Sequence, residues 1–161
     1  MTIVIRPETP EDFIAIDQIN DAAFGETAQS RIIRELRDAN EVLWSKVLEK
    51  DGQLIGHLLF YRVLIDGQPI AAGLGPIAIH PHIQKQGHGS AIIKDGLKTC
   101  DPEKHQIVFL LGHTSYYPRF GFTSELGAQF TSPWPRPAFM GLQLNLNAPQ
   151  SGTLTFPNAY L

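Results

Sequence analysis

Residues 74–91 read LGPIAIHPHIQKQGHGSA, a stretch that joins an apolar run to a turn and then to the start of a predicted helix. The turn has the spacing Gln84-x-x-Gly87-x-Gly89, and its two glycines let the main chain approach a ligand closely because they carry no side chain. The first N–H groups of the following helix have no acceptor within the helix and lie at the positive end of its dipole. The stretch therefore predicts a cradle for an anionic diphosphate, with a plain strand-to-helix turn as the alternative interpretation.

The length and composition of the chain limit the classes of protein to which it can belong. Its 161 residues, 43% of them hydrophobic, predict one domain that buries roughly 70% of its unfolded surface. A net charge of −3 without a long basic run indicates no nucleic-acid partner. The single cysteine, Cys100, argues against a disulfide framework and against a thiolate metal site. With no leader-like start and no apolar run near the ~20 residues that span a bilayer, we expect a cytoplasmic protein with no membrane partner.

Apolar periodicity and turn residues predict the element order β-α-α-β-β-β-α-β-α-β-β. We expect Thr9 to cap the first helix, with Pro10 at its first position and Asp12 three residues after the cap. Two Asp-Gly dipeptides, at 51–52 and 66–67, predict consecutive hairpins. The expected strands are 3–6, 42–48, 54–65, 70–79, 107–111 and a terminal hairpin of 142–146 with 153–156. The expected helices start at 10, run over about 27–37 and 89–99, and include a short helix or turn at 115–119.

Several short motifs accompany this order of elements. They are Ala23-Phe24-Gly25 with Leu36-Arg37, Gly56-His57, residues 73–81 (GLGPIAIHP), residues 84–89, and Leu111-Gly112 leading to residues 117–122 (YPRFGF). Order and motifs together resemble the GNAT superfamily of N-acetyltransferases over nearly the whole chain, and within it the YhbS-like predicted acetyltransferases. The resemblance implies an α/β (α+β) fold, with one GNAT-like domain over residues 1–161 and a mixed, mostly antiparallel central sheet flanked by helices.

The resemblance also implies that the chain binds acetyl-CoA as a co-substrate, without a metal, and transfers the acetyl group to a primary amine of a small molecule, peptide or protein. The main chain of Ile77, Ala78 and Ile79 would pair with the pantetheine arm as another strand does, and Tyr117 would face the thioester sulfur. The CoA diphosphate would be held by Gln84, Lys85, Gln86, Gly87, His88, Gly89 and Ser90. Residues 112–115 (GHTS) depart from the family, because an acidic residue is expected after the glycine.

Amine attack on a thioester needs a deprotonated nucleophile, a polarised carbonyl and a proton for the leaving thiolate. A main-chain N–H near Ile79 is the expected oxyanion donor. Tyr117 is the expected general acid, because a phenol with a pKa of about 10 is protonated at neutral pH. Strand 73–79 has no carboxylate, so the general base is open between Glu26, His113 and a relayed water.

The acceptor side is predicted from position in the fold. Phe24, Glu26 and His113 are the candidate substrate-binding residues. A cluster of aromatic and proline residues either lines the acceptor pocket or forms a loop lid or a dimer surface. The cluster consists of Phe130, Trp134, Pro135, Pro137 and Phe139. The sequence leaves the acceptor unidentified, and it leaves the chain a monomer or a homodimer.

Several of these residues have simpler interpretations. Tyr117 can be a core aromatic with a satisfied hydroxyl, His113 a structural residue at a strand end, and Glu26 only a partner for a helix dipole. His80 and His82 have a spacing that can ligate a metal, but no carboxylate or cysteine lies nearby in the sequence, which favours a solvated turn. For the whole chain, a non-catalytic acyl-CoA sensor or an interaction module is the alternative to an enzyme.

Overall fold

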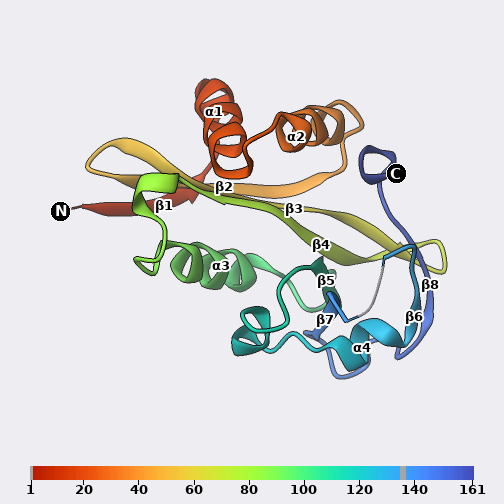
Figure 1. Cartoon of the computed structure of the whole chain (residues 1–161). Coiled ribbons are helices and arrows are strands. Elements are labelled where there is room, and N and C mark those ends of the chain that lie inside the picture. The colour runs from red at the N-terminus through yellow and green to blue at the C-terminus, as the bar shows by residue number, and fades with distance from the viewer. Residues whose placement is uncertain (1, 135–136) are drawn as a thin grey trace. The chain divides into compact units, whose positions relative to one another are not determined.

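The computed structural model describes residues 2–134 and 137–161 and divides them into two compact units. The first unit holds residues 2–61, 75–99 and Tyr160, and the second holds the other described residues. The hydrogen-bonded strand order is β1 (Ile3–Pro7), β2 (Val42–Lys50), β3 (Gln53–Ile65), β4 (Gln68–Ile79), β5 (Ile107–Leu111) and β7 (Phe139–Gln143) (Figure 1). In addition, β8 (Gly152–Thr155) pairs with β3 and with β6 (Phe130–Thr131). This mixed, mostly antiparallel sheet confirms the predicted fold class. The prediction of a single domain over residues 1–161 stays a prediction.

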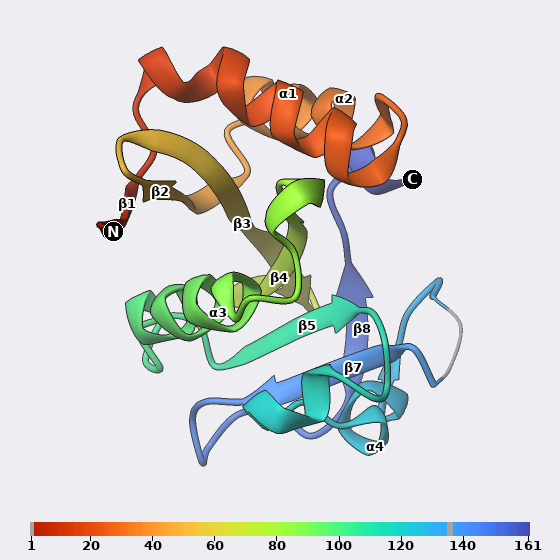
Figure 2. The ribbon, with the colours of Figure 1, turned by 60° about the vertical axis from the view of Figure 1, so that its left-hand side comes forward.

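Helices cover both faces of the strands in the first unit. Figures 1 and 2 show α1 and α2 on one face and α3 on the other. Fully buried apolar side chains from both the helices and the strands form this unit's core, among them Ile16, Leu36, Leu48, Phe60 and Ile92. The elements are β1 (Ile3–Pro7), α1 (Phe13–Phe24), α2 (Ala28–Asp38), β2 (Val42–Lys50), the first part of β3 (Gln53–Ile65), the last part of β4 (Gln68–Ile79) and α3 (His88–Thr99).

The start of α1 follows the predicted capping pattern. The carboxylate of Asp12 accepts a hydrogen bond from the main-chain N–H of Thr9 at 2.8 Å. Pro10 begins a 3-10 turn, η1 (Pro10–Asp12), that leads directly into the helix. At the other end, Gly25 closes α1 with a left-handed φ of +71°. Thr9 is thus the N-cap residue of the 3-10 turn with Pro10 at its first position, whereas α1 itself begins at Phe13 with Asp12 as its N-cap residue.

Both predicted hairpins form. The turn residues Asp51, Gly52, Asp66 and Gly67 have φ values between +48° and +81°. Two-residue hairpin turns of the common type require positive φ at both positions, which aspartate tolerates and glycine adopts freely. The two turns join β2 to β3 in the first unit and β3 to β4 in the second, as the Asp-Gly dipeptides predict.

The second unit is built around β5, which pairs in parallel with β4 and antiparallel with β7. Its core includes the buried side chains of Val63, Val108, Phe109, Phe122 and Met140. Besides the end of β3 and the start of β4, its elements are β5 (Ile107–Leu111), η3 (Tyr117–Phe120), α4 (Ser124–Ala128), β6 (Phe130–Thr131), β7 (Phe139–Gln143) and β8 (Gly152–Thr155). Among the described residues of either unit, no helix is long and apolar enough to cross a membrane.

The predicted terminal hairpin is wrong. β7 pairs with β5, whereas β8 pairs with the end of β3 and with β6. β7 also begins earlier than expected, and its first residues, Phe139 and Met140, are buried. Burying these two side chains against the core favours the edge of β5 over a local turn. The short helix α4 was also not predicted from the sequence. Its N-cap residue is Thr123, whose hydroxyl accepts a hydrogen bond from the N–H of Leu126 at 3.2 Å.

An ion-pair cluster fixes β1 to the start of α1 and to β2. The guanidinium of Arg6 donates to Asp12 at 2.8 and 2.9 Å and to Glu49 at 2.8 Å. The hydrogen bonds that Asp12 accepts from Arg6, the largest cause, and from the N–H of Thr9 lower the pKa of Asp12 from about 3.8 to about 2. The Asp12 side chain is only 11% exposed, so solvent screens this pair less than an ordinary surface pair.

We expect Asp12→Asn to lower the free energy of unfolding by about 1–2 kcal/mol at pH 7, because a charge-assisted hydrogen-bond acceptor is lost. The pKa of Asp12 is depressed in the folded state, so its contribution is fully present above about pH 4 and is lost as the pH falls toward about 2. Chemical unfolding between pH 7 and pH 2 should show the difference between the two proteins shrinking on acidification. Asp38→Asn, at an exposed position, should change stability by less than about 0.5 kcal/mol.

Candidate active site

The last part of β4 runs beyond the pairing with β5. Among the described residues, that pairing joins residues 71–73 to residues 107–109, and β4 continues to Ile79. The carbonyl oxygen of Ile79 accepts a hydrogen bond from the side-chain amide of Gln84 at 3.0 Å. The predicted pantetheine-binding strand and the first residue of the predicted diphosphate loop are therefore tied together inside the first unit.

The loop after β4 leads into the N-terminus of α3. A 3-10 turn, η2 (Pro81–Ile83), is followed by two residues with positive φ, Lys85 at +64° and Gly87 at +85°. The carbonyl of Gly87 accepts the hydrogen bond from the N–H of Ala91 at 3.1 Å, which closes the first turn of α3. Residues 84–87 are exposed. This loop places exposed main chain before the positive end of a twelve-residue helix, an arrangement that suits an anion.

His80 and His82 lie at the start of this loop. Their rings are 5.1 Å apart between centroids, and the N–H of His82 donates to Nδ1 of His80 at 3.3 Å. Within residues 2–134 and 137–161, no group of three or more histidine, cysteine or carboxylate side chains could hold a metal ion. The contact between the two histidines stabilises the turn that precedes Gln84.

Tyr117 lies in the second unit at the start of η3. Its main-chain N–H donates to the carbonyl of His113 at 3.3 Å, and its ring meets the buried ring of Phe122 edge-on, 6.3 Å between centroids. The ring also lies directly against Gly112, where an added Cβ would be 2.8 Å from Cδ2 of Tyr117. Burial raises the pKa of the Tyr117 hydroxyl, with a smaller effect of Tyr116, so the phenol is protonated at neutral pH.

Tyr116 has a different environment from Tyr117. The guanidinium carbon of Arg119 lies 4.3 Å from the centre of the Tyr116 ring, and Nε of Arg119 donates to the Tyr116 carbonyl at 2.8 Å. The Arg119 side chain thus covers one face of this ring as a cation–π partner. The two neighbouring tyrosines are therefore distinguishable: Tyr117 packs against Gly112, and Tyr116 packs against an arginine.

The candidate substrate-binding residues are divided between the units. Phe24, 42% exposed, ends α1, and the exposed Glu26 follows Gly25 in the turn before α2. His113 is exposed in the second unit, and its main-chain carbonyl accepts the N–H groups of both tyrosines, Tyr116 and Tyr117. His113 and Tyr117 are thus neighbours, whereas Phe24 and Glu26 belong to the other unit.

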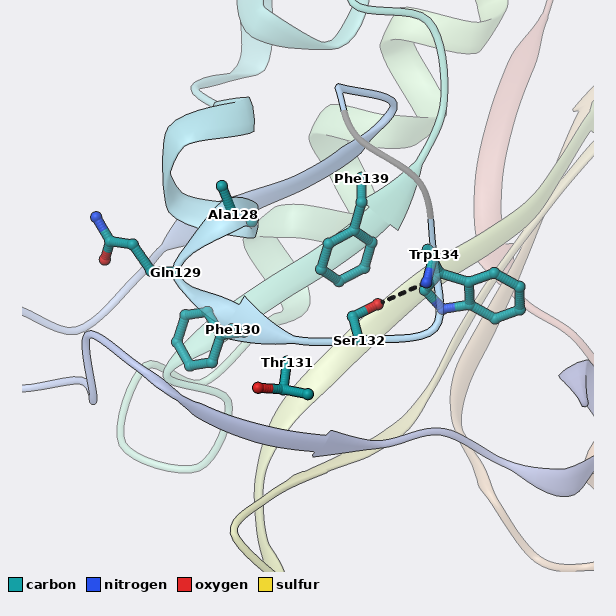
Figure 3. Close-up of a pocket in the computed structure, with 8 residues that line it drawn as sticks. Ala128, Gln129, Phe130, Thr131, Ser132, Trp134 and Phe139 are labelled. Atoms are coloured by element: carbon teal, nitrogen blue, oxygen red, sulfur yellow. Dashed lines mark hydrogen bonds between the residues drawn. The ribbon is translucent and has the colours of Figure 1, made fainter.

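The aromatic cluster of the second unit borders a cavity of about 320 Å³ (Figure 3). Of the predicted cluster, Phe130, Trp134 and Phe139 line this cavity, and the N–H of Trp134 donates to the Ser132 hydroxyl at 3.1 Å. Pro137 is exposed, and Pro135 lies outside the described residues. The other lining residues are Gly127, Ala128, Gln129, Thr131 and Ser132.

A buried histidine that the sequence analysis noted only within a motif lies in the first unit. His57, fully buried on β3, has Nδ1 at 3.1 Å from the side-chain nitrogen of Asn20 on α1 and Nε2 at 2.8 Å from the hydroxyl of Ser45 on β2. The Asn20 amide nitrogen can only donate, so Nδ1 accepts and the proton of the neutral ring lies on Nε2. Burial, with a smaller effect of Arg37, lowers the pKa of His57 to about 3. This ring is neutral and serves to join α1 to the sheet.

Comparison with known proteins identifies the family. The model of the acetyltransferase (GNAT) domain matches residues 4–124. The chain belongs to the GNAT acetyltransferase family. The uncharacterized N-acetyltransferase YjhQ of Escherichia coli is 30% identical over 128 residues, which are 76% of this chain and 71% of YjhQ. The predicted family is therefore confirmed.

Two solved GNAT structures resemble the chain over almost its whole length. A GNAT family acetyltransferase from Brucella melitensis in complex with acetyl-CoA has a TM-score of 0.84 and 31% identity and covers 99% of both chains. The Escherichia coli GNAT protein YhbS in complex with CoA has a TM-score of 0.89 and 26% identity and covers 98% of this chain and 91% of that chain. The YhbS-like GNAT proteins that the motifs resemble are thus similar to this chain in sequence and in fold.

The contact between Gly112 and Tyr117 predicts the effect of a single methyl group. Gly112→Ala should lower the free energy of unfolding by about 1–3 kcal/mol, because the added Cβ overlaps the tyrosine ring. In a Tyr117→Ala background the same change should cost at least about 1 kcal/mol less, since the ring is gone. Urea unfolding of the two single variants and the double variant measures this coupling. Strictly additive losses would show that the methyl group meets some other obstacle.

Proposed function

We propose that this protein is an acetyl-CoA-dependent N-acetyltransferase that acetylates a primary amine of a small molecule, peptide or protein. The observation that carries the proposal is the exposed loop over residues 84–87, which leads into α3 and follows the part of β4 that extends beyond its pairing with β5. Membership of the GNAT family and the CoA complexes of two similar proteins support the same ligand.

In this proposal the first unit binds acetyl-CoA through main-chain groups. The edge of β4 at Ile77, Ala78 and Ile79 pairs with the amide groups of the pantetheine arm. The diphosphate accepts hydrogen bonds at the start of α3, where the helix dipole also favours its charge. The contributing residues of the loop and first turn are Gln84, Lys85, Gln86, Gly87, His88, Gly89 and Ser90. Backbone donors suit a chain with a net charge of −3, because they bind an anion without many lysines or arginines.

The proposed chemistry is direct transfer. The amine nitrogen attacks the carbonyl carbon of the thioester, the tetrahedral intermediate is stabilised by a main-chain N–H near Ile79, and the carbon–sulfur bond then breaks. The thiolate takes its proton from the hydroxyl of Tyr117, which burial keeps protonated. The proton of the attacking amine goes to a base, for which Glu26, His113 and a relayed water are the candidates. The buried His57, with a pKa of about 3, is too weak a base for this role.

For the acceptor side, we propose that Phe24, Glu26 and His113 contact the amine substrate. Two of these side chains are charged or polar and all three are exposed, so each is available to a ligand. The cavity beside Phe130 and Trp134 is mostly walled by uncharged residues, which suits an uncharged part of an acceptor.

A screen of acetyl-CoA consumption against a panel of primary amines tests the proposal. The expected result is CoA release that depends on at least one amine, with the matching acetylated product detected by mass spectrometry. Tight binding of acetyl-CoA without turnover of any amine would instead favour a non-catalytic acyl-CoA sensor. Absence of binding to CoA and to acetyl-CoA would overturn both readings.

Gly89→Val should weaken binding of CoA at least tenfold, because a branched side chain in the first turn of α3 obstructs the approach of the diphosphate to the main chain. Isothermal titration calorimetry with CoA measures the change. Lys98→Val places the same side chain at an exposed position near the other end of α3 and should leave the affinity within about twofold of wild type. Equal affinities of the Gly89 variant and the wild type would show that the diphosphate does not bind at this loop.

Tyr117→Phe should lower kcat by about 100-fold or more, while the affinity for acetyl-CoA stays near wild type, because the ring remains and only the acidic proton is lost. Steady-state kinetics with the amine found in the screen measure both quantities. Tyr116→Phe is the matched control and should have little effect on the rate, since Arg119 covers its ring. Full activity of Tyr117→Phe would mean that water or another group protonates the thiolate.

A further inference from the structure

Tyr160 makes a contact that the proposed function does not use. It lies in the short 3-10 helix η4 (Asn158–Tyr160), and its hydroxyl donates a hydrogen bond to the main-chain carbonyl of Gly75 at 2.8 Å. Its ring packs against that of Tyr61, with 4.6 Å between the centroids. Tyr160, Gly75 and Tyr61 all belong to the first unit, although 85 residues separate the donor from the acceptor.

Gly75 is the point at which β4 leaves regular strand geometry. Its φ is +147°, a backbone conformation that residues with side chains rarely adopt. It also follows closely on residues 71–73, the part of β4 that pairs with β5. A main-chain carbonyl that has left a strand ladder needs another hydrogen-bond partner, and the Tyr160 hydroxyl is that partner for Gly75.

The surroundings of Tyr160 keep this hydrogen bond in place. Burial raises the pKa of the Tyr160 hydroxyl well above 10, with a smaller effect of Tyr61, so the hydroxyl remains a donor throughout the physiological range. The buried ring of Tyr61, 6% exposed, limits the directions in which the Tyr160 ring can point. The bond therefore acts as a fixed support for the Gly75 carbonyl.

We propose that Tyr160 is a positioning residue for acetyl-CoA. By holding the carbonyl of Gly75, it fixes the course of β4 immediately before residues 77–79, whose main chain binds the pantetheine arm in the proposed function. The Gln84 side chain holds the other end of the same segment through the carbonyl of Ile79. The segment that binds the cofactor is thus supported by a side chain at each end. This inference rests on the proposed function.

Tyr160→Phe tests the proposal, because it keeps the ring packed on Tyr61 and removes only the hydroxyl. We expect the Kd for CoA and the KM for acetyl-CoA to rise roughly three- to tenfold, the range that one neutral hydrogen bond supplies, with kcat changed by less than twofold. Inhibition by ADP, which has the diphosphate but lacks the pantetheine arm, should be unchanged. Leu161→Ala, at the neighbouring exposed position, is the control and should match wild type in every measurement.

A second measurement separates positioning from general loosening. Amide hydrogen exchange of Tyr160→Phe should rise in residues 75–79 and stay near wild type in α1 and α2, with a melting temperature only a few degrees lower. Unchanged CoA affinity with unchanged exchange at residues 75–79 would overturn the inference and leave the proposed function intact. A parallel loss of ADP affinity, or increased exchange throughout the first unit, would also overturn it, because a merely structural role predicts those results. Failure of the wild type to bind CoA would count against the proposed function itself.

Discussion

The short pairing between β4 and β5 is the constraint on which the candidate site depends. Every main-chain N–H and C=O group needs a hydrogen-bond partner. A strand that extends beyond its neighbour has main-chain groups on that edge which the neighbour cannot pair. Here the parallel pairing stops at residue 73 while β4 continues to Ile79. Side chains take up two of the carbonyl groups, since Tyr160 bonds Gly75 and Gln84 bonds Ile79. The segment between them is the part of β4 proposed to pair with the pantetheine arm.

The helices of the first unit are fixed by buried polar contacts as well as by apolar packing. Asn20 of α1 bonds His57 of β3, which in turn bonds Ser45 of β2. From α2, Arg37 reaches Glu8 at 3.1 Å and covers the ring of Phe13, with 3.7 Å from the guanidinium carbon to the ring centre. These polar contacts favour one arrangement of the helices over others in which the contacts would be broken. Because these contacts hold α1 on the strands of the first unit, they also hold the end of α1, where Phe24 lies.

Tyr116 and Tyr117 illustrate how environment separates two identical side chains. Both N–H groups bond to the same carbonyl, that of His113, so their main-chain contacts are nearly equal. The absence of a side chain at Gly112 admits the Tyr117 ring, whereas Arg119 lies over the Tyr116 ring. Burial raises the pKa of the Tyr117 hydroxyl, and a well-protonated phenol is what a leaving thiolate requires.

Local patterns in the sequence determined the turns, a helix cap and the family of this protein. The two Asp-Gly turns, the cap at Thr9 and the loop before α3 follow from residues close together in the chain, because turn and cap geometry depends on a few neighbouring dihedral angles. The motifs from Phe24 to the tyrosine pair were sufficient to identify the family. Only the tertiary structure decided that β7 joins β5 rather than β8, because burial of Phe139 in a shared core outweighs a short local turn. It also decided that Tyr160 meets Gly75, since a hydrogen bond between residues 85 positions apart leaves no periodic or local trace in the sequence.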